Sequence, residues 1–186
     1  RGSSLRLTAR RGDRELTLVV LRDLLTAPTV RHCRLIGGDK PIGYVRISGF
    51  DYDTAMEMCR ALDRLDSQGA QSYLIDLRTN GGGLMTAAID AVRLFIDNGL
   101  IATVKTERQK TRYEAGGNAF RSYRKPVAIL VDENTASAAE IFTAALQEHQ
   151  RATVIGQKTF GKALVQTVYD LNHAQTALCI TTASYT

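Results

Sequence analysis

The sequence lacks the features that mark membrane-spanning, disulfide-rich and zinc-binding proteins. No segment approaches the ~18 consecutive apolar residues that span a bilayer. The three cysteines, Cys33, Cys59 and Cys179, show no C-x-x-C spacing, and no H-E-x-x-H motif is present. Because the number is odd, at least one thiol has no partner within the chain. These absences argue against a membrane span, a disulfide framework and a zinc site, and we expect the cysteines to be small buried apolar residues.

The chain also lacks a leader sequence and a strong charge bias. It opens on Arg1-Gly-Ser-Ser rather than on a signal or transit peptide, so we expect it to be a piece of a longer protein. The net charge is only +5, and no basic run exceeds a pair such as Arg10-Arg11. This pattern favours a solvated basic surface over nucleic-acid binding, while an anionic membrane surface stays an alternative partner.

What is present predicts an α/β domain. A chain of 186 residues with 44% hydrophobic and 23% charged residues can bury a core of ordinary size. Short apolar segments alternate with segments whose apolar residues recur at helical spacing, which predicts strand–helix crossovers and a partly parallel sheet. We predict helices over 51–65, 84–96 and 136–148, strands over 5–10, 15–21, 33–36, 42–47, 72–77, 100–104, 126–131, 152–155, 165–171 and 177–184, and a polar ribbon over 105–123.

Residues 156–163, GQKTFGKA, nearly match a phosphate-binding P-loop. Ala163 stands where that motif needs a Ser or Thr to hold Mg²⁺. The β-branched, alternating residues 165–169 predict a strand where a P-loop needs a helix. Both departures argue against an NTPase, and they leave Lys162 without a phosphate partner.

Lys162 has an apolar sequence context that suits a general base. Phe160 and Gly161 precede it, and Ala163-Leu-Val165 follows it. Desolvation lowers the pKa of a lysine, and a neutral amine can accept a proton. The ordinary alternative is an exposed loop lysine, which is how we interpret Lys158.

Ser137 is the best candidate for a nucleophile that such a base would serve. It follows a predicted strand at the start of a predicted helix, and its neighbours Ala136, Ala138 and Ala139 leave room for a substrate carbonyl. The N–H groups in the first turn of a helix are unpaired, so they can donate to a developing oxyanion. The alternative is that Ser137 merely caps the helix, as Thr135 also could.

A histidine-based serine hydrolase is weakly supported. No G-x-S-x-G motif is present, and His32, His149 and His173 all lie in polar segments. We therefore interpret the three histidines as surface residues.

The segment Asp76-Leu-Arg-Thr-Asn-Gly-Gly-Gly83 ends a predicted strand with three consecutive glycines. A turn from strand to helix needs one or two glycines but hardly three. Because each glycine adds an entropic cost, the run indicates a place where the backbone comes close to another group. It could line a substrate and offer N–H donors.

Together, three segments resemble the carboxyl-terminal processing proteases, Ser-Lys endopeptidases of the bacterial periplasm and the thylakoid lumen. Asp76-Leu-Arg-Thr-Asn-Gly-Gly-Gly83 resembles the D-L-R-x-N-x-G-G segment of that family, and Thr135-Ala-Ser-Ala-Ala-Glu140 resembles its S-A-S-A-S-E segment. Thr159-Phe-Gly-Lys-Ala-Leu-Val-Gln166 resembles T-F-G-K-G-x-V-Q. The resemblance runs from about residue 43 to the end of the chain, with Thr135, Ala139 and Ala163 as departures.

The resemblance implies a serine endopeptidase that processes the C-terminal tail of protein substrates without a cofactor or metal. The implied catalytic residues are Ser137 as nucleophile, Lys162 as general base and Gln166 as the residue that holds the lysine amine. The implied supporting groups are Glu140 and the N–H groups of Gly83 and Ala138, which would form the oxyanion hole.

The same resemblance implies a fold and a cellular setting. Residues 23–186 would form a crotonase/ClpP-like protease core of short strands and crossover helices, truncated at its C-terminal end. Residues 1–22 would be the last β-hairpin of a mostly absent PDZ domain. The implied partners are a protein substrate whose free C-terminal tail binds as a β-strand and a PDZ domain in cis, in an exported compartment such as the periplasm or the thylakoid lumen.

Two alternatives stay open. A catalytically silent module of the same fold could hold C-terminal peptides, although the chain retains both Ser137 and Lys162. An enzyme similar to acyl-CoA hydratases would share the glycine-rich oxyanion loop, but its chemistry would not need a serine and a lysine at these positions.

Overall fold

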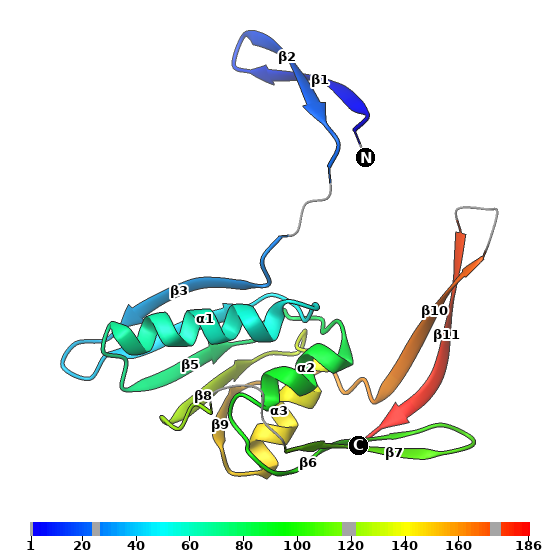
Figure 1. The fold of residues 1–186 in the computed structure, drawn as a ribbon. Helices are drawn as coiled ribbons and strands as arrows, with labels where there is room; N and C mark the ends of the chain where they lie inside the picture. The colour runs from blue at the N-terminus through cyan, green and yellow to red at the C-terminus, as the bar shows by residue number, and fades with distance from the viewer. Residues whose placement is uncertain (1, 24–26, 117–121, 172–175) are drawn as a thin grey trace.

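The computed structural model describes residues 2–23, 27–116, 122–171 and 176–186. Its body is a five-stranded sheet with helices packed against it (Figure 1). The strand order is β3-β4-β5-β8-β9, with β3 antiparallel to β4 and the remaining neighbours parallel, which confirms the predicted α/β class with a partly parallel sheet. The bounds are β3 Val30–Ile36, β4 Ile42–Ile47, β5 Ser72–Asp76, β8 Val127–Val131 and β9 Ala152–Gly156, with α1 Thr54–Ser67, α2 Met85–Val92 and α3 Ala138–Glu148.

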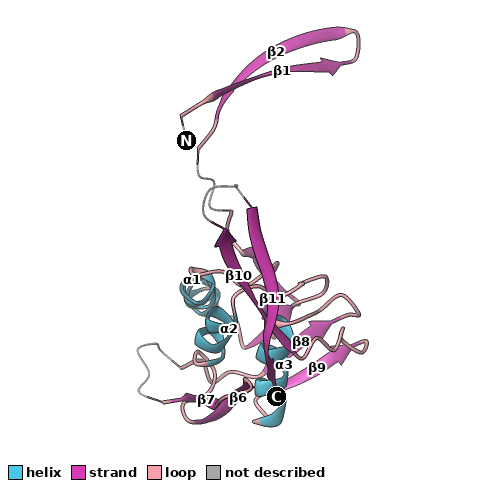
Figure 2. Ribbon diagram, turned by 90° about the vertical axis from the view of Figure 1, so that its right-hand side faces the viewer, coloured by secondary structure: helices cyan, strands magenta, loops and turns pink. Residues whose placement is uncertain are grey.

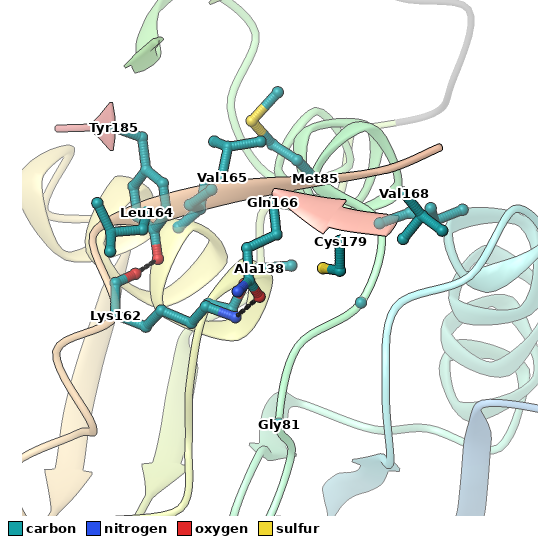
Figure 3. A pocket seen from close by; sticks show the side chains of 14 residues that line it. Gly81, Met85, Ala138, Lys162, Leu164, Val165, Gln166, Val168, Cys179 and Tyr185 are labelled. Carbon is teal, nitrogen blue, oxygen red and sulfur yellow. Dashed lines mark hydrogen bonds between the residues drawn. The ribbon is translucent and has the colours of Figure 1, made fainter. Parts of the chain in front are cut away.

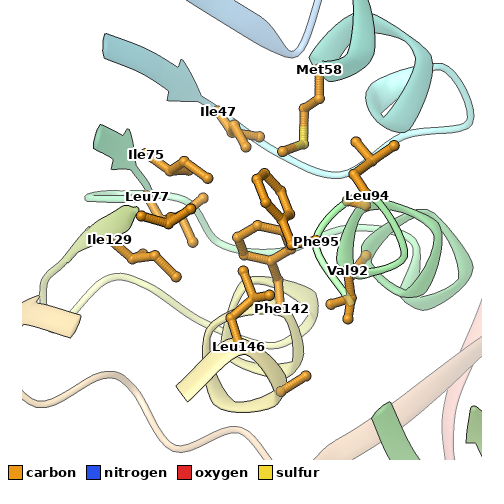
Figure 4. Packing of buried hydrophobic residues seen from close by; sticks show 14 of the residues in the cluster. Ile47, Met58, Ile75, Leu77, Val92, Leu94, Phe95, Ile129, Phe142 and Leu146 are labelled. Atoms are coloured by element: carbon orange, nitrogen blue, oxygen red, sulfur yellow. The ribbon is translucent and has the colours of Figure 1, made fainter. Parts of the chain in front are cut away.

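The apolar core lies between the helices and one face of this sheet (Figure 4). Side chains alternate along a strand, so every second residue of β4 faces the helices, and Val45 and Ile47 are fully buried. Phe95 and Phe142 meet inside the core with ring centroids 6.1 Å apart and ring planes at 79°. The opposite face is more open, since Leu130 of β8 stays only half-buried. The buried face fixes where the ends of β5 and β8 lie, and both ends carry segments of the site.

A second, antiparallel sheet has the strand order β10-β11-β6-β7. β10 and β11 form a long hairpin that projects away from the helices (Figures 1 and 2). Residues 157–163 run from β9 of the first sheet to β10 of the second, so this connection joins the two sheets. The bounds are β6 Gly99–Lys105, β7 Lys110–Ala115, β10 Leu164–Leu171 and β11 Thr176–Tyr185.

The N-terminal hairpin of β1 (Ser4–Arg11) and β2 (Arg14–Leu21) stands apart from the rest of the chain (Figure 1). Every residue of both strands is exposed. The cross-strand pairs Leu5–Val20 and Leu7–Leu18 place leucine and valine side chains on one face, because paired residues share a face. This apolar face has the pattern of a strand pair that normally packs on a core.

Each predicted helix and strand is present within the described residues, but several predicted boundaries are wrong. α3 begins at Ala138, two residues later than predicted, and of the two residues considered as its cap, Ser137 rather than Thr135 takes the N-cap position. α2 ends at Val92 rather than at residue 96. The predicted ribbon over 105–123 contains β7, which pairs with β6, while residues 117–121 of that prediction lie outside the described part.

The prediction that the cysteines are buried is wrong. Cys33 and Cys59 are half-buried, and Cys179 is exposed on the β10–β11 hairpin. The apolar sequence around Cys179 suggested burial, but the hairpin projects from the body, so many of its apolar residues are exposed. In the described part of the chain, no helix combines the length and the apolar character that a membrane crossing requires.

Candidate active site

Three segments that are distant in sequence line one cavity of about 370 Å³ (Figure 3). The glycine-rich segment follows β5, the start of α3 follows β8, and the lysine-bearing connection leads into β10. The cavity therefore lies where the two sheets meet. Its lining residues are Gly81, Gly83, Leu84, Met85, Ser137, Ala138, Ile141, Lys162, Leu164, Val165, Gln166, Val168, Cys179 and Tyr185.

Ser137 occupies a strained turn between β8 and α3. Its backbone has φ 57° and ψ −121°, a region that non-glycine residues rarely adopt. A strained strand-to-helix turn is also what exposes the nucleophile in α/β-hydrolases, although the G-x-S-x-G motif is absent here. The turn is thus built to present the side chain of Ser137 to the cavity at the N-terminus of a helix.

The glycine-rich segment is held against this turn by buried polar contacts. The side chain of Asn80 is fully buried, where it donates to the Ile47 carbonyl and accepts from the Gly82 N–H, both at 2.9 Å. The Asn80 carbonyl accepts from the Ala136 N–H at 2.9 Å. These bonds tie the segment to β4 on one side and to the serine turn on the other.

Two of the three glycines are required by close backbone approach. A Cβ on Gly82 would lie 2.7 Å from the Ala136 carbonyl oxygen and 2.7 Å from the Cβ of Ser137. A Cβ on Gly83 would lie 2.1 Å from the carbonyl oxygen of Phe50, the residue with which Gly83 forms an isolated parallel bridge. The expectation that this run marks a close approach is met at these two positions, while Gly81 faces open space.

The N–H groups of Gly83 and Ala138 are free to serve a ligand. Within the described part of the chain, neither group donates a hydrogen bond. Both residues line the cavity beside Ser137. This is the arrangement that an oxyanion hole requires, since unpaired backbone donors beside a nucleophile can stabilise developing negative charge.

Glu140 connects the serine turn to the lysine loop. Its Oε2 accepts from the Ser137 N–H at 2.7 Å and from the Lys162 N–H at 2.9 Å. Its Oε1 accepts from the Thr159 hydroxyl at 2.8 Å and from the Gly161 N–H at 2.6 Å. One carboxylate therefore fixes the backbones of both candidate catalytic residues.

The Lys162 amine is directed at Gln166. Lys162 Nζ donates to Gln166 Oε1 at 2.7 Å, which is the contact that the family resemblance implies (Figure 3). No hydrogen bond joins Lys162 Nζ to the hydroxyl of Ser137, although both residues are described and both line the cavity. The structure brings the two residues together in one site without a hydrogen bond between their side chains.

The sequence neighbours of Lys162 form only part of the expected apolar surroundings. Phe160 is 67% exposed and Leu164 is 48% exposed, while Lys162 itself is half-buried. Leu164 and Val165 nevertheless line the same cavity as Lys162, so the apolar surroundings are present on one side only. The cavity is open to water as it stands.

Asp76 is a buried carboxylate that shapes the start of the glycine-rich segment. Its side chain is fully buried and accepts from Arg78 Nη2 and from the Tyr44 hydroxyl, each at 2.7 Å. Burial by itself raises the pKa of Asp76, but hydrogen bonds from Arg78 and Tyr44 and the charge of Arg78 outweigh it and lower the pKa to about 2. The ionised form of Asp76 therefore stabilises the fold.

Substituting Asp76→Asn should remove a pH-dependent part of the free energy of unfolding. A carboxylate whose pKa is lowered on folding contributes fully above its unfolded value, 3.8, and loses that contribution as pH falls through about 2. The contribution is at most about 2 kcal/mol at neutral pH. Urea unfolding at pH 7 should therefore show D76N to be less stable, and its stability should fall less steeply than that of the wild type from pH 4 towards pH 2. Asp39→Asn, in an exposed turn, is the control, and an equal loss in that variant would contradict the assignment.

Sequence reasoning missed three residues that organise the site. Asn80 was quoted only as part of a motif, and Thr135 was considered as a helix cap. Thr135 is instead fully buried, and its hydroxyl donates to the Leu77 carbonyl at 2.9 Å, which links the ends of β5 and β8. Tyr185 lines the cavity from the end of β11. The Asn-Gly-Gly-Gly run carried a usable signal for Asn80, whereas nothing near Tyr185 in sequence indicated a role.

The described histidines do not contribute to the cavity. His149 contacts the Leu100 carbonyl at 2.7 Å, and neither His149 nor His32 belongs to the lining. His173 lies outside the described residues. Among the residues that the structure describes, no group of three His, Cys, Asp or Glu side chains is arranged to hold a metal ion.

Sequence comparison relates the chain to one group of peptidases. Residues 41–186 match the peptidase family S41. The chain is 40% identical over 145 residues to a carboxyl-terminal-processing protease of Synechocystis sp., an alignment that covers 77% of this chain and 33% of that protein. It is 35% identical over 189 residues to a carboxyl-terminal-processing protease of Picosynechococcus sp., covering 100% of this chain and 45% of that protein.

Structural comparison finds solved structures of C-terminal processing and S41 proteases. A photosystem II D1 C-terminal processing protease superposes with a TM-score of 0.72 at 29% identity, over 100% of this chain and 51% of that one. An S41 protease of Bacteroides fragilis superposes with a TM-score of 0.71 at 16% identity, over 98% of this chain and 54% of that one, which supports the fold alone. The chain thus spans about a third to a half of the length of these relatives.

Proposed function

The chain belongs to peptidase family S41, and from that premise we propose that the protein is a serine endopeptidase that processes the C-terminal tails of protein substrates. One observation carries the proposal. Ser137, on its strained turn, shares a cavity with Lys162 and with the unpaired N–H groups of Gly83 and Ala138. A nucleophile, a base and oxyanion donors are the groups that acyl transfer needs.

The proposed reaction begins with proton transfer from Ser137 to Lys162. The uncharged Lys162 amine takes the hydroxyl proton while Ser137 Oγ forms a bond to the substrate carbonyl carbon. The resulting oxyanion accepts hydrogen bonds from the N–H groups of Gly83 and Ala138. When the C–N bond breaks, the protonated Lys162 gives its proton to the leaving amine, and water then hydrolyses the acyl-enzyme ester.

The supporting residues have distinct proposed roles. Gln166 accepts from the Lys162 amine at 2.7 Å and would aim it, so that a rotation of the lysine side chain brings Nζ to Ser137. Glu140 would keep the serine turn and the lysine loop in register, because its carboxylate bonds the backbone of both. Neither residue needs to take part in proton transfer itself.

The position of β10 supports substrate capture as a β-strand. β10 is the edge strand of its sheet, so one side of its backbone is free to pair with an extended peptide. Its residues Leu164, Val165 and Val168 line the cavity. A peptide laid along this edge would pass Ser137 in a fixed pose, and the apolar lining would favour an uncharged residue at the cleaved bond.

The wider assignments follow from the resemblance and the architecture. We assign residues 23–186 to a crotonase/ClpP-like protease core and residues 1–22 to the last hairpin of a PDZ domain. The apolar face of the β1–β2 hairpin supports the second assignment, because such a face needs a partner to pack on. The PDZ domain would act in cis. An exported compartment fits the relatives, among which a peptidase of Tetradesmus obliquus is described as chloroplastic.

Labelling with a fluorophosphonate probe tests the function directly. An activated serine should form a covalent adduct with the probe, and peptide mapping should place the adduct on Ser137. Ser137→Ala should abolish the adduct in a protein that still folds, with a loss of about 1 kcal/mol in stability because Ser137 is the N-cap of α3. A folded wild-type protein that binds C-terminal peptides but takes no label would instead be the catalytically silent module.

A further inference from the structure

Tyr185, near the end of β11, contacts the lysine loop from an element that the proposed mechanism does not use. Its hydroxyl donates to the Lys162 carbonyl (Figure 3). Its backbone N–H donates to the Ala163 carbonyl at 3.1 Å. The residue is fixed in turn by the pairing of β11 with β6, in which Tyr185 lies opposite Val104. The second sheet therefore contacts the backbone of the candidate base through this tyrosine, in addition to the side-chain contact from Gln166 of β10.

The contact completes a set of anchors around Lys162. The Lys162 N–H is bonded to Glu140 of α3 at 2.9 Å, and the Lys162 carbonyl is bonded to Tyr185 of β11. The amine at the end of the side chain is bonded to Gln166 of β10. Each polar group of this residue is thus held by a different element, and Tyr185 supplies the contact that the sequence motifs do not contain.

Tyr185 is also close to the nucleophile. Its half-buried side chain lines the same cavity as Ser137. Burial and the charge of Glu140 raise the pKa of Tyr185 to about 12, and a hydrogen bond with Ser137 offsets part of that rise. The phenol therefore keeps its proton at neutral pH and stays a donor to the Lys162 carbonyl.

We propose that Tyr185 is a positioning residue whose hydroxyl fixes the Lys162 backbone within reach of Ser137. The proposal rests on the proposed function and adds a residue to it. Glu140 and the backbone N–H of Tyr185 hold the loop on either side of Lys162, but without the hydroxyl the Lys162 carbonyl would be free to turn. A displacement of about 1 Å at a catalytic group can cost on the order of 100-fold in rate. The hydroxyl–carbonyl contact removes that freedom without touching the substrate.

Tyr185→Phe tests the proposal because it removes one hydroxyl and keeps the ring. The rate of fluorophosphonate labelling should be measured against probe concentration for the full chain. We expect the maximal labelling rate of Y185F to fall by about 10- to 100-fold. The probe concentration that gives half-maximal rate should stay unchanged, since the cavity lining is intact. Tyr169→Phe is the matched control, because Tyr169 is 48% exposed on β10 and lies outside the cavity lining.

The outcomes separate this proposal from the proposed function. If wild type and Y185F label at the same maximal rate, positioning by Tyr185 is wrong while the peptidase assignment stands. If the loss in Y185F matches the fraction unfolded by circular dichroism, the role is purely structural and the proposal is also wrong. Tyr185→His keeps a donor on a ring and should recover part of the rate. If the folded wild type takes no label, the proposed function fails, and this inference fails with it.

Discussion

Replacing Lys162 with alanine should lower the rates of probe labelling and peptide cleavage by about 10²- to 10⁴-fold, the range that a general base contributes. Thermal unfolding should stay unchanged. The Lys162 side chain is half-buried, and its amine makes a hydrogen bond to the exposed side chain of Gln166, so its removal leaves no buried group unpaired. The loss would therefore report on chemistry rather than on folding.

The lysine loop offers a matched control and a sharper variant. Lys158→Ala removes an exposed lysine four residues earlier, outside the cavity lining, and should leave both rates at wild-type values. Lys162→Arg keeps the positive charge, but a guanidinium cannot give up its proton in a protein, so this variant should be as slow as Lys162→Ala. Normal turnover in either Lys162 variant would remove lysine from the mechanism.

The sequence predicted those features of the fold and the site that depend on residues close together in the chain. The alternation of strands and helices followed from apolar periodicity, and the glycine run indicated a close backbone approach before its partner was known. That partner proved to be the serine turn on one side and Phe50 on the other. Local patterns carry this information because a positive φ or a missing Cβ is a property of the residue itself.

The hydrogen bonds between segments that are distant in the chain could not be predicted in this way. Glu140 accepts hydrogen bonds from the N–H of Ser137, three residues earlier, and from the N–H of Lys162, 22 residues later. Only the fold determines that Lys162 comes within reach of Glu140. Tyr185 lies beside the lysine loop because β11 pairs with β10, and the same end of β11 is held by β6, a strand some 80 residues earlier in the chain. Such contacts follow from sheet topology, which a single sequence does not specify residue by residue.

The failed prediction about Lys162 has the same origin. Apolar neighbours in sequence suggested an apolar pocket, but they enclose the lysine only in part, since Leu164 and Val165 line the cavity while Phe160 does not. Phe160 is 67% exposed, and the polar groups that bond Lys162 come from α3, β10 and β11. A substrate strand along β10 would be the element that excludes water, so the apolar environment would form on binding.

Substituting Gly82→Ala should lower both stability and activity strongly, because the added methyl group pushes the glycine-rich segment away from the serine turn. Gly82 has φ +97°, and a Cβ there would lie 2.7 Å from both the Ala136 carbonyl oxygen and the Cβ of Ser137. The positive φ and the overlap with backbone should together cost about 2–4 kcal/mol of the free energy of unfolding. The folded fraction should also label at least about 100-fold more slowly, since the serine turn must move by a fraction of an ångström or more to admit the methyl group.

Gly81→Ala is the control that isolates this cause. Gly81 lies one residue earlier in the same run, but a Cβ there would meet nothing within 4 Å and its φ lies outside the left-handed region. Gly81→Ala should therefore leave the free energy of unfolding unchanged or raise it by about 0.5 kcal/mol, as the unfolded chain loses freedom. Urea unfolding of the two variants compares them directly. If both lost stability equally, the glycines would serve the flexibility of the loop, and the contact between Gly82 and the serine turn would not be what positions Ser137.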